Sequence, residues 1–284
     1  MTVLPQADAL QRLLKAAGAA YGLSGDQAIV AAPGTQAILQ WLPVLFPVRT
    51  VAVLGPTYGE HARLWRAVAT VRTVASLEEA VGADLTVVVN PNNPDGRIVP
   101  PADLAAFAKT SEADGTPRLI VDEAFCDVAP EASVAGAKGT VVLKSFGKFF
   151  GLAGLRLGFA VGAPTWTQAL QTALGPWAVG GSALATGAMA LADTAWIAAT
   201  RSRLAKARAR LDATLTANGL TVVGGTDLFR LVETDEAQAL HHRLASEGIW
   251  IRRFDDAPNR LRMGLPADEA RFAQTLARVT SVGV

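Results

Sequence analysis

The chain has 284 residues, which allows one large domain and a smaller one at roughly 100–200 residues per domain. Half of the residues are hydrophobic, so a sizeable core can be buried. A net charge of +1, with only 18% charged residues, argues against a nucleic-acid partner. The single cysteine, Cys126, excludes a disulfide framework and a cysteine-based zinc site.

The three histidines, His61, His241 and His242, do not suggest a metal site, because the last two are adjacent and cannot share a helix face. We expect structural or surface roles for all three, and no metal. The chain shows no basic segment followed by the apolar segment of a signal peptide. Its most apolar stretch, Ala178–Thr200, contains Asp193 and predicts a buried helix rather than a membrane span. We therefore expect a cytoplasmic protein without a membrane partner.

Strand-like and helical patterns alternate through the first two thirds of the chain. Asp8–Tyr21 predicts an amphipathic helix. The expected helices that follow run from Thr35 to Phe46, from Glu60 to Ala69 and from Pro101 to Lys109. The expected strands are continuous apolar runs, which are typical of a sheet covered on both faces: Ala28–Ala32, Thr50–Leu54, Leu85–Asn90, Leu119–Val121, Thr140–Leu143 and Leu157–Val161. This alternation predicts an α/β, doubly wound architecture with a mostly parallel sheet.

The pattern changes after Trp177. A long helix is expected over about Asp193–Asn218, and its series of arginines and lysines predicts a solvated face. Short strands and a final helix follow, which predict a smaller α+β domain: Leu220–Val223, Phe229–Val232, Ile249–Arg252, Leu261–Met263 and the helix Ala267–Val279. We place the large α/β domain at residues 22–192. The small domain then comprises residues 1–21 and 193–284 and includes the N-terminal helix.

The segment from Ser145 to Arg156 places Lys148 among glycines and aromatic residues, directly after an apolar strand. Desolvation lowers the pKa of a lysine and makes its amine a usable nucleophile for a Schiff base. Arg156 follows eight residues later and carries a planar guanidinium that suits a phosphate. Ser145 adds a hydroxyl donor. Taken alone, the segment is also consistent with a tight turn that carries a surface lysine.

Three further segments stand beside expected strands. The turn Asn90–Gly96 contains Asn93 and lies where ligands bind in open α/β sheets, although these residues also make ordinary turns. Asp122 stands at the end of an expected strand. It is either a core aspartate or a functional carboxylate. A Walker-type nucleotide hydrolase is disfavoured because no G-x-x-x-x-G-K-[ST] loop occurs. The segment Gly34–Gln36 begins a helix whose N–H groups suit a phosphate, or is an ordinary helix start.

The order and spacing of Asn93, Asp122, Lys148 and Arg156 resemble those of the fold-type I pyridoxal-phosphate (PLP) enzymes, the aspartate aminotransferase superfamily. The resemblance covers nearly the whole chain from about Leu4 onward. It implies the PLP-dependent transferase-like fold and pyridoxal 5′-phosphate as the cofactor. It also implies a homodimer, because the active sites of these enzymes lie at a subunit interface.

The same resemblance implies a role for each matching residue. Lys148 would hold the cofactor as a Schiff base and move protons at the substrate Cα. Asp122 would pair with the pyridinium nitrogen and keep the ring an electron sink. Asn93 would hydrogen-bond the ring oxygen, and Tyr58 would stack on the ring. The phosphate would be held by Gly34, Thr35, Gln36, Ser145 and Arg156.

Residues of the C-terminal third and of the Gly175–Val179 segment are implied to bind the substrate. Arg262 would clamp the substrate carboxylate, because a bidentate geometry favours arginine. Arg252 matches a family arginine that helps to hold a phosphate or carboxylate, and Arg253 is a weaker candidate. Trp177 is a further candidate for substrate binding.

Within the superfamily, the chain is similar to the histidinol-phosphate aminotransferase branch, and more narrowly to the threonine-phosphate decarboxylases of cobalamin biosynthesis. The segment Ser145–Phe159 carries this similarity, with Gly147 where typical histidinol-phosphate enzymes have serine. The implied reaction is decarboxylation of L-threonine O-3-phosphate to an aminopropanol phosphate. The alternative is an aminotransferase acting on histidinol phosphate or another amino acid. A protein that binds PLP without turnover is a third hypothesis.

The sequence departs from the family pattern at two places. Phe125 stands where many aminotransferases have a tyrosine that donates to the ring oxygen, so that oxygen would rely on Asn93. The N-terminal stretch that usually covers the active site, and supplies a tyrosine to the partner subunit's phosphate, has no counterpart, since Tyr21 is the first tyrosine. A natural short form, a different start and weakened activity are all open explanations.

Overall fold

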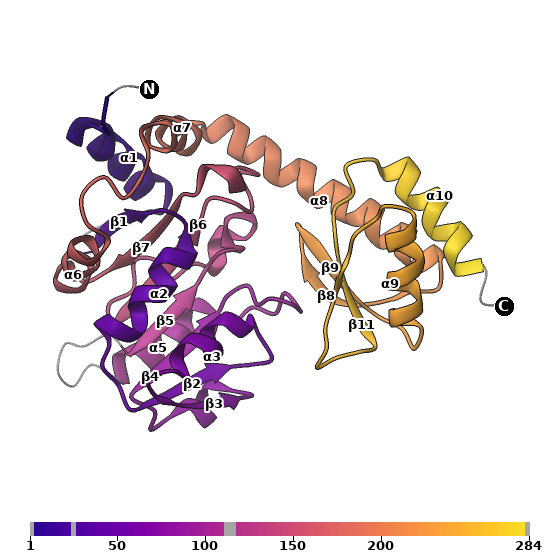
Figure 1. Cartoon of the computed structure of the whole chain (residues 1–284), viewed down its shortest axis with the longest axis horizontal. Coiled ribbons are helices and arrows are strands. Elements are labelled where there is room, and N and C mark those ends of the chain that lie inside the picture. The colour runs from indigo at the N-terminus through magenta and orange to yellow at the C-terminus, as the bar shows by residue number, and fades with distance from the viewer. Residues whose placement is uncertain (1–2, 24–26, 111–117, 282–284) are drawn as a thin grey trace. The chain divides into compact units, whose positions relative to one another are not determined.

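The computed structural model describes residues 3–23, 27–110 and 118–281, which divide into two compact units. The first unit extends to Asn93 and resumes over Ile98–Thr194. The second comprises Pro94–Arg97 and the chain from Ala195 onward. Helix α1 (Ala7–Ala20) lies in the first unit, although we expected it in the small domain (Figure 1). The reason is its apolar face, which packs on α7 (Gly181–Ala192).

The first unit is built on a seven-stranded sheet of order β1-β7-β6-β5-β4-β2-β3. The strands are β1 (Ala28–Ala32), β2 (Thr50–Leu54), β3 (Thr70–Val74), β4 (Leu85–Val89), β5 (Leu119–Asp122), β6 (Thr140–Ser145) and β7 (Gly158–Gly162). All neighbouring pairs are parallel except those that β7 makes with β6 and β1. The expected mostly parallel sheet is confirmed. The edge strand β3 was not predicted, because its sequence is half polar.

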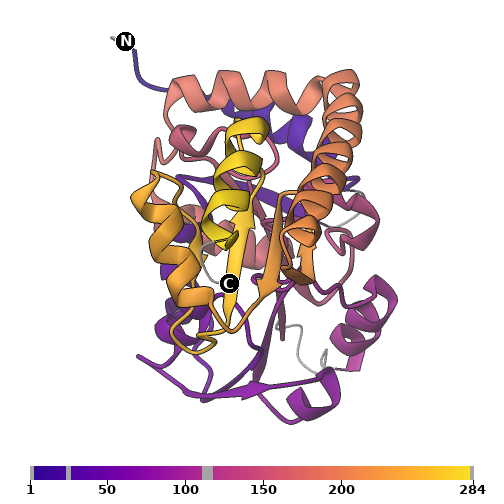
Figure 2. The ribbon, with the colours of Figure 1, turned by 90° about the vertical axis from the view of Figure 1, so that its right-hand side faces the viewer.

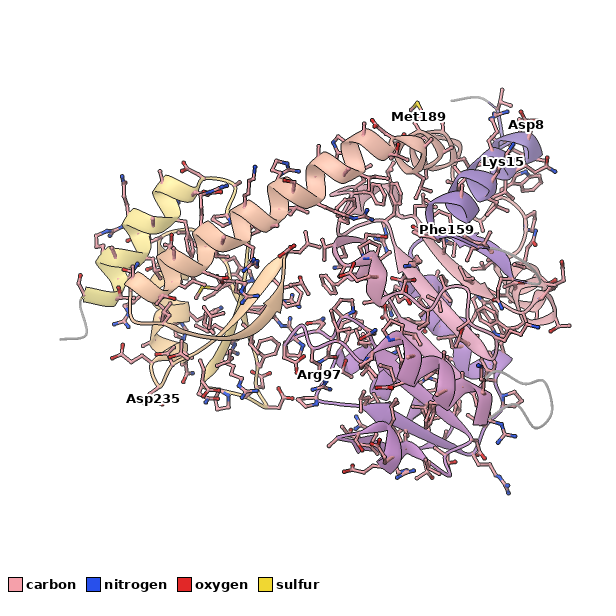
Figure 3. All side chains as sticks on the ribbon, turned by 180° about the vertical axis from the view of Figure 1, so that it is seen from behind. Asp8, Lys15, Arg97, Phe159, Met189 and Asp235 are labelled. Carbon is pink, nitrogen blue, oxygen red and sulfur yellow. The ribbon has the colours of Figure 1, made fainter. Side chains whose placement is uncertain are left out.

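Helices cover both faces of this sheet, as the continuous apolar strands predicted. One core joins the sheet to α2 (Thr35–Leu45), α3 (Gly59–Trp65) and α6 (Pro164–Leu174). The other joins it to α4 (Leu77–Ala80) and α5 (Pro101–Thr110). Phe159 of β7, labelled in Figure 3, meets the ring of Tyr21 just after α1, with centroids 5.9 Å apart.

The second unit is an α+β structure, as expected. Its antiparallel sheet has the order β10-β11-β9-β8, and three helices share one core with it (Figures 1 and 2). The strands are β8 (Thr221–Thr226), β9 (Phe229–Glu233), β10 (Arg252–Arg253) and β11 (Arg260–Gly264). The helices are α8 (Thr194–Ala217), α9 (Ala237–Ser246) and α10 (Glu269–Thr280). Helix α9 was not predicted.

The apolar stretch Ala178–Thr200 forms two helices instead of one, because α7 ends before Asp193 and α8 begins after it. Along the described part of the chain, no helix is long and apolar enough to cross a membrane. The basic series of α8 is only partly a solvated face. Arg208 lies 2.9 Å from Asp227, and Arg210 lies 2.6 Å from Glu269 of α10.

A close backbone contact in the second unit fixes the turn that follows Asn93. The amide of Gly225 donates to the carbonyl of Asp95 at 2.7 Å. Gly96 has a φ of +74°, and a Cβ there would overlap the Gly225 carbonyl. Only glycine meets both conditions, because it has no side chain and tolerates positive φ. The segment Pro94–Arg97 therefore packs with β8 although it follows a strand of the first unit.

Candidate active site

One edge of the large sheet gathers the residues predicted to bind the cofactor. Strands β2, β4, β5 and β6 are parallel, and β1 runs with them because β1 and β6 are both antiparallel to β7. Their carboxyl ends and the amino end of β7 therefore share an edge, where ligands bind in such sheets. That edge carries Gly34, Thr35, Gln36, Tyr58, Asn93, Asp122, Ser145, Lys148 and Arg156.

The start of helix α2 and Arg156 form a close-fitting cup. Gly34 has a φ of +85°, and a Cβ at this position would lie 2.6 Å from a guanidinium nitrogen of Arg156. A Cβ on Gly158 would lie 2.6 Å from the amide nitrogen of Thr35. Ser145 pairs with Gly158 across β6 and β7. The cup therefore combines helix N–H groups, a hydroxyl and a guanidinium, which is a donor set for a phosphate.

Asp122 is a buried carboxylate, with 4% of its surface exposed. Its Oδ1 accepts from the amide of Ala124 at 3.0 Å, and its Oδ2 lies 2.9 Å from Nε2 of His61. The bond therefore joins a ring nitrogen of α3 to the carboxylate at the end of β5. Nδ1 of His61 is buried without a hydrogen-bond partner among the described residues. The histidine therefore orients the carboxylate from the α3 side of the sheet.

The contact between His61 and Asp122 was not predicted from the sequence, which gave this histidine only a structural or surface role. The side chain is buried on α3 and bonds the predicted cofactor aspartate. The available signal was its spacing from Tyr58, because residues three apart on a helix are neighbours. The two rings meet edge to face with centroids 6.0 Å apart.

The turns after β2 and β4 are tied together by Asn92. Its Oδ1 accepts from the Thr57 hydroxyl at 2.6 Å, and its Nδ2 donates to the Pro56 carbonyl at 3.0 Å. These bonds fix the turn that carries Tyr58 beside the turn that carries Asn93. Tyr58 keeps 38% of its surface exposed.

Lys148 is exposed on a loop that is anchored by aromatic packing. Phe146 stacks on Phe150 at 4.2 Å between centroids, and Phe149 meets Phe150 edge to face at 5.1 Å. The Lys148 amine lies 5.4 Å from the centroid of the Phe125 ring. Phe125 is therefore an apolar neighbour of the predicted Schiff-base lysine.

Arg252 and Arg262 face each other in the second unit. They are direct partners in the antiparallel pair of β10 and β11, so their side chains share one face of the sheet. Burial, and then the positive charge of Arg252, lower the pKa of Arg262 below its ordinary value. The guanidinium of Arg262 also lies 5.0 Å from the Phe229 ring centroid. Two neighbouring cations of this kind favour an anionic ligand.

Trp177 is 60% exposed and has a φ of +55°. It lines a pocket between α1, β1 and the end of α6, together with residues such as Leu10, Val30 and Leu174. None of the predicted cofactor residues lines this pocket. The role of Trp177 in substrate binding stays a prediction. Within the described ranges, no group of three or more His, Cys, Asp or Glu side chains could hold a metal ion.

The family model for aminotransferase class I and II matches residues 4–278 of the chain. The chain belongs to this family. Two curated relatives are threonine-phosphate decarboxylases. The one from Sinorhizobium sp is 46% identical over 257 residues, which cover 87% of this chain and 76% of the relative. The one from Pseudomonas aeruginosa is 42% identical over 281 residues, covering 96% and 82%.

Solved structures of aminotransferases share the fold. A histidinol-phosphate aminotransferase from Clostridium acetobutylicum has a TM-score of 0.87 at 21% identity and covers 99% of this chain and 91% of its own. The one from Sinorhizobium meliloti, solved in complex with pyridoxal-5′-phosphate, has a TM-score of 0.85 at 24% identity, covering 99% and 83%. An aspartate aminotransferase from Thermus thermophilus has a TM-score of 0.77 at 23% identity, covering 94% and 85%. The expected fold is confirmed.

Proposed function

We propose that this protein is a PLP-dependent decarboxylase that converts L-threonine O-3-phosphate to an aminopropanol phosphate for cobalamin biosynthesis. The observation that carries the proposal is the meeting, at one sheet edge, of a phosphate cup, a buried carboxylate and a lysine. The two threonine-phosphate decarboxylases at 46% and 42% identity support the choice of reaction.

The residues at this edge fit PLP group by group. The cup of Gly34, Thr35 and Arg156 suits its phosphate. The buried carboxylate of Asp122 suits its ring nitrogen, and the Lys148 amine suits its aldehyde. When bound, PLP supplies an electron sink for the bond broken at the substrate Cα.

Each residue then has a task in holding groups or moving protons. Lys148 would hold the cofactor and carry a proton to or from the substrate Cα. Asp122, oriented by His61, would keep a proton on the ring nitrogen. Asn93 would hydrogen-bond the ring oxygen. Tyr58 would stack on the ring from the turn that Asn92 fixes.

Threonine phosphate carries two anionic groups, which matches the paired arginines of the second unit. Arg262 is assigned to the carboxylate, and Arg252 helps to hold the phosphate or carboxylate. If both anions were clamped, the substrate could take only one orientation, and that orientation would select between decarboxylation and transamination.

An assay of the purified protein with threonine phosphate, with and without 2-oxoglutarate, tests the reaction type. We expect an aminopropanol phosphate and carbon dioxide without any oxo acid. Product that forms only with the oxo acid would identify the protein as an aminotransferase, the alternative that the family name favours. Histidinol phosphate in parallel reactions tests that alternative substrate.

Substitution of the reactive lysine tests the assignment of the cofactor. We expect Lys148→Ala to lose the visible absorption of lysine-bound PLP and the adduct that borohydride reduces. Lys206→Ala removes an exposed lysine of α8 and is the matched control, which should retain both signals. A reducible adduct that persists in Lys148→Ala would contradict the role of Lys148.

The family resemblance also leads us to propose that the enzyme works as a cytoplasmic homodimer. The substrate is a small molecule in either reading of the activity. Sedimentation of the purified protein measures the assembly, and a monomer at assay concentrations that is fully active would overturn this part of the proposal.

A further inference from the structure

A buried ion pair lies directly behind the candidate site. Glu123 follows Asp122, and Lys144 precedes Ser145. The Glu123 carboxylate is 2.5 Å from the Lys144 amine, with the two residues 0% and 2% exposed. Burial lowers the pKa of Lys144, but Glu123, with Cys126 and Asp127 nearby, more than offsets this, so the pKa lies above its ordinary value. The Lys144 amine is therefore held in its charged form beside Glu123.

The pair is completed by the loop after β5. Glu123 accepts from the Ser133 hydroxyl and from the amide of Val134, both at 2.6 Å. The Lys144 amine also donates to the Ser133 hydroxyl at 3.2 Å, and it lies 4.9 Å from the centroid of the Tyr21 ring. The carboxylate and the amine are thus held in one geometry by several directional bonds.

The strand register relates this pair to the site. Asp122 pairs with Leu143 across β5 and β6, so Asp122, Leu143 and Ser145 share one face of the sheet. Glu123 and Lys144 share the opposite face by the same alternation. The ion pair therefore joins the ends of β5 and β6. Each of its two residues is adjacent in sequence to a residue that would contact the cofactor, Asp122 at the ring nitrogen and Ser145 at the phosphate.

Stability alone does not require such a pair, because apolar residues of similar volume often replace a buried ion pair without loss of stability. A directional link instead fixes the distance between the two strand ends. Supporting residues of this kind hold the side chains of a binding site in the geometry that the ligand requires. A change in the distance between Asp122 and Ser145 would disturb the contacts at both ends of the rigid cofactor.

We propose that Glu123 and Lys144 are positioning residues that set the spacing of Asp122 and Ser145 for the cofactor. This inference rests on the proposed function, because it takes Asp122 as the partner of the ring nitrogen and Ser145 as a phosphate ligand.

The test compares variants that keep the fold but change the link. In Glu123→Met/Lys144→Met the pair becomes apolar, and we expect an unfolding midpoint in urea close to that of the wild type. Affinity for PLP should fall on the order of tenfold or more, as for other supporting residues. The visible circular dichroism per bound cofactor should also fall, because it reports the seating of the ring. Lys144→Arg keeps the positive charge beside Glu123 and should retain an affinity closer to that of the wild type than the double variant does.

Wild-type affinity and circular dichroism in Glu123→Met/Lys144→Met would overturn the inference while leaving the proposed function intact. Wild-type protein that shows no lysine-bound PLP would overturn the proposed function and the inference together. If the double variant does not fold, Glu123→Asp shortens the carboxylate and keeps its charge. The same loss of affinity and circular dichroism is then expected in a folded protein, and unchanged values would overturn the inference.

Discussion

At the scale of single residues, the bond between His61 and Asp122 gives the sharpest prediction. His61→Phe removes the donor at 2.9 Å from a carboxylate that is 4% exposed. The loss should lower the free energy of unfolding by about 1–3 kcal/mol, because a buried acceptor is left without its partner. It should also weaken PLP binding, as measured by titration of the visible absorption band.

The matched control is His242→Phe, which changes an exposed histidine on α9. It should leave both quantities unchanged. Equal PLP affinity in the His61 variant and the control would show that Asp122 does not need the histidine.

The residue scale also shows how far sequence reasoning reached at the site. Asp122, Lys148 and Arg156 were assigned to the cofactor through the family resemblance, which rests on their residue types, order and spacing. His61 was not predicted, because nothing in its own sequence position shows that a strand end more than sixty residues later will lie 2.9 Å away.

At the scale of elements, the turn after Asn93 depends on a glycine contact. Gly96→Ala adds a Cβ at φ +74° that overlaps the Gly225 carbonyl. We expect a loss of about 2–4 kcal/mol in the free energy of unfolding, because both the left-handed backbone and the overlap are unfavourable. Denaturant unfolding measures it.

Gly136→Ala is the control for this variant, since a Cβ there meets nothing within 4 Å. Its unfolding midpoint should stay near that of the wild type. A Gly96 variant as stable as this control would mean that the turn moves freely away from β8.

Elements were predicted where their apolar pattern was strong. The runs that became β2, β4 and β5 are fully apolar, or nearly so, and were placed to within one residue. Strand β3 and helix α4 were missed, because a half-exposed edge strand and a single helical turn have too few buried side chains to produce a period.

At the scale of the whole molecule, the residues predicted to bind the cofactor and the paired arginines belong to different units. Substitutions should therefore affect cofactor binding and substrate binding independently. Arg252→Ala and Arg262→Ala should each keep PLP absorption but raise the KM for threonine phosphate roughly 10- to 100-fold, the effect of losing a charged hydrogen bond.

Arg253→Ala is the matched control, because it lies next to Arg252 on β10 and pairs with Leu261, so that its side chain points to the opposite face. It should leave KM unchanged. Loss of PLP binding in the Arg252 or Arg262 variants, with KM unaffected, would reverse the assignment.

The sequence by itself determined the fold class, and through the family resemblance it predicted the residues of the cofactor site. Those properties follow from local patterns and from side chains whose chemistry has few substitutes. Only the tertiary structure decided that α1 packs in the first unit, that His61 supports Asp122, and that Glu123 and Lys144 link two strand ends. Each of these contacts joins segments that are distant in the sequence. Strand order and register determine such contacts, and the local sequence does not reveal them.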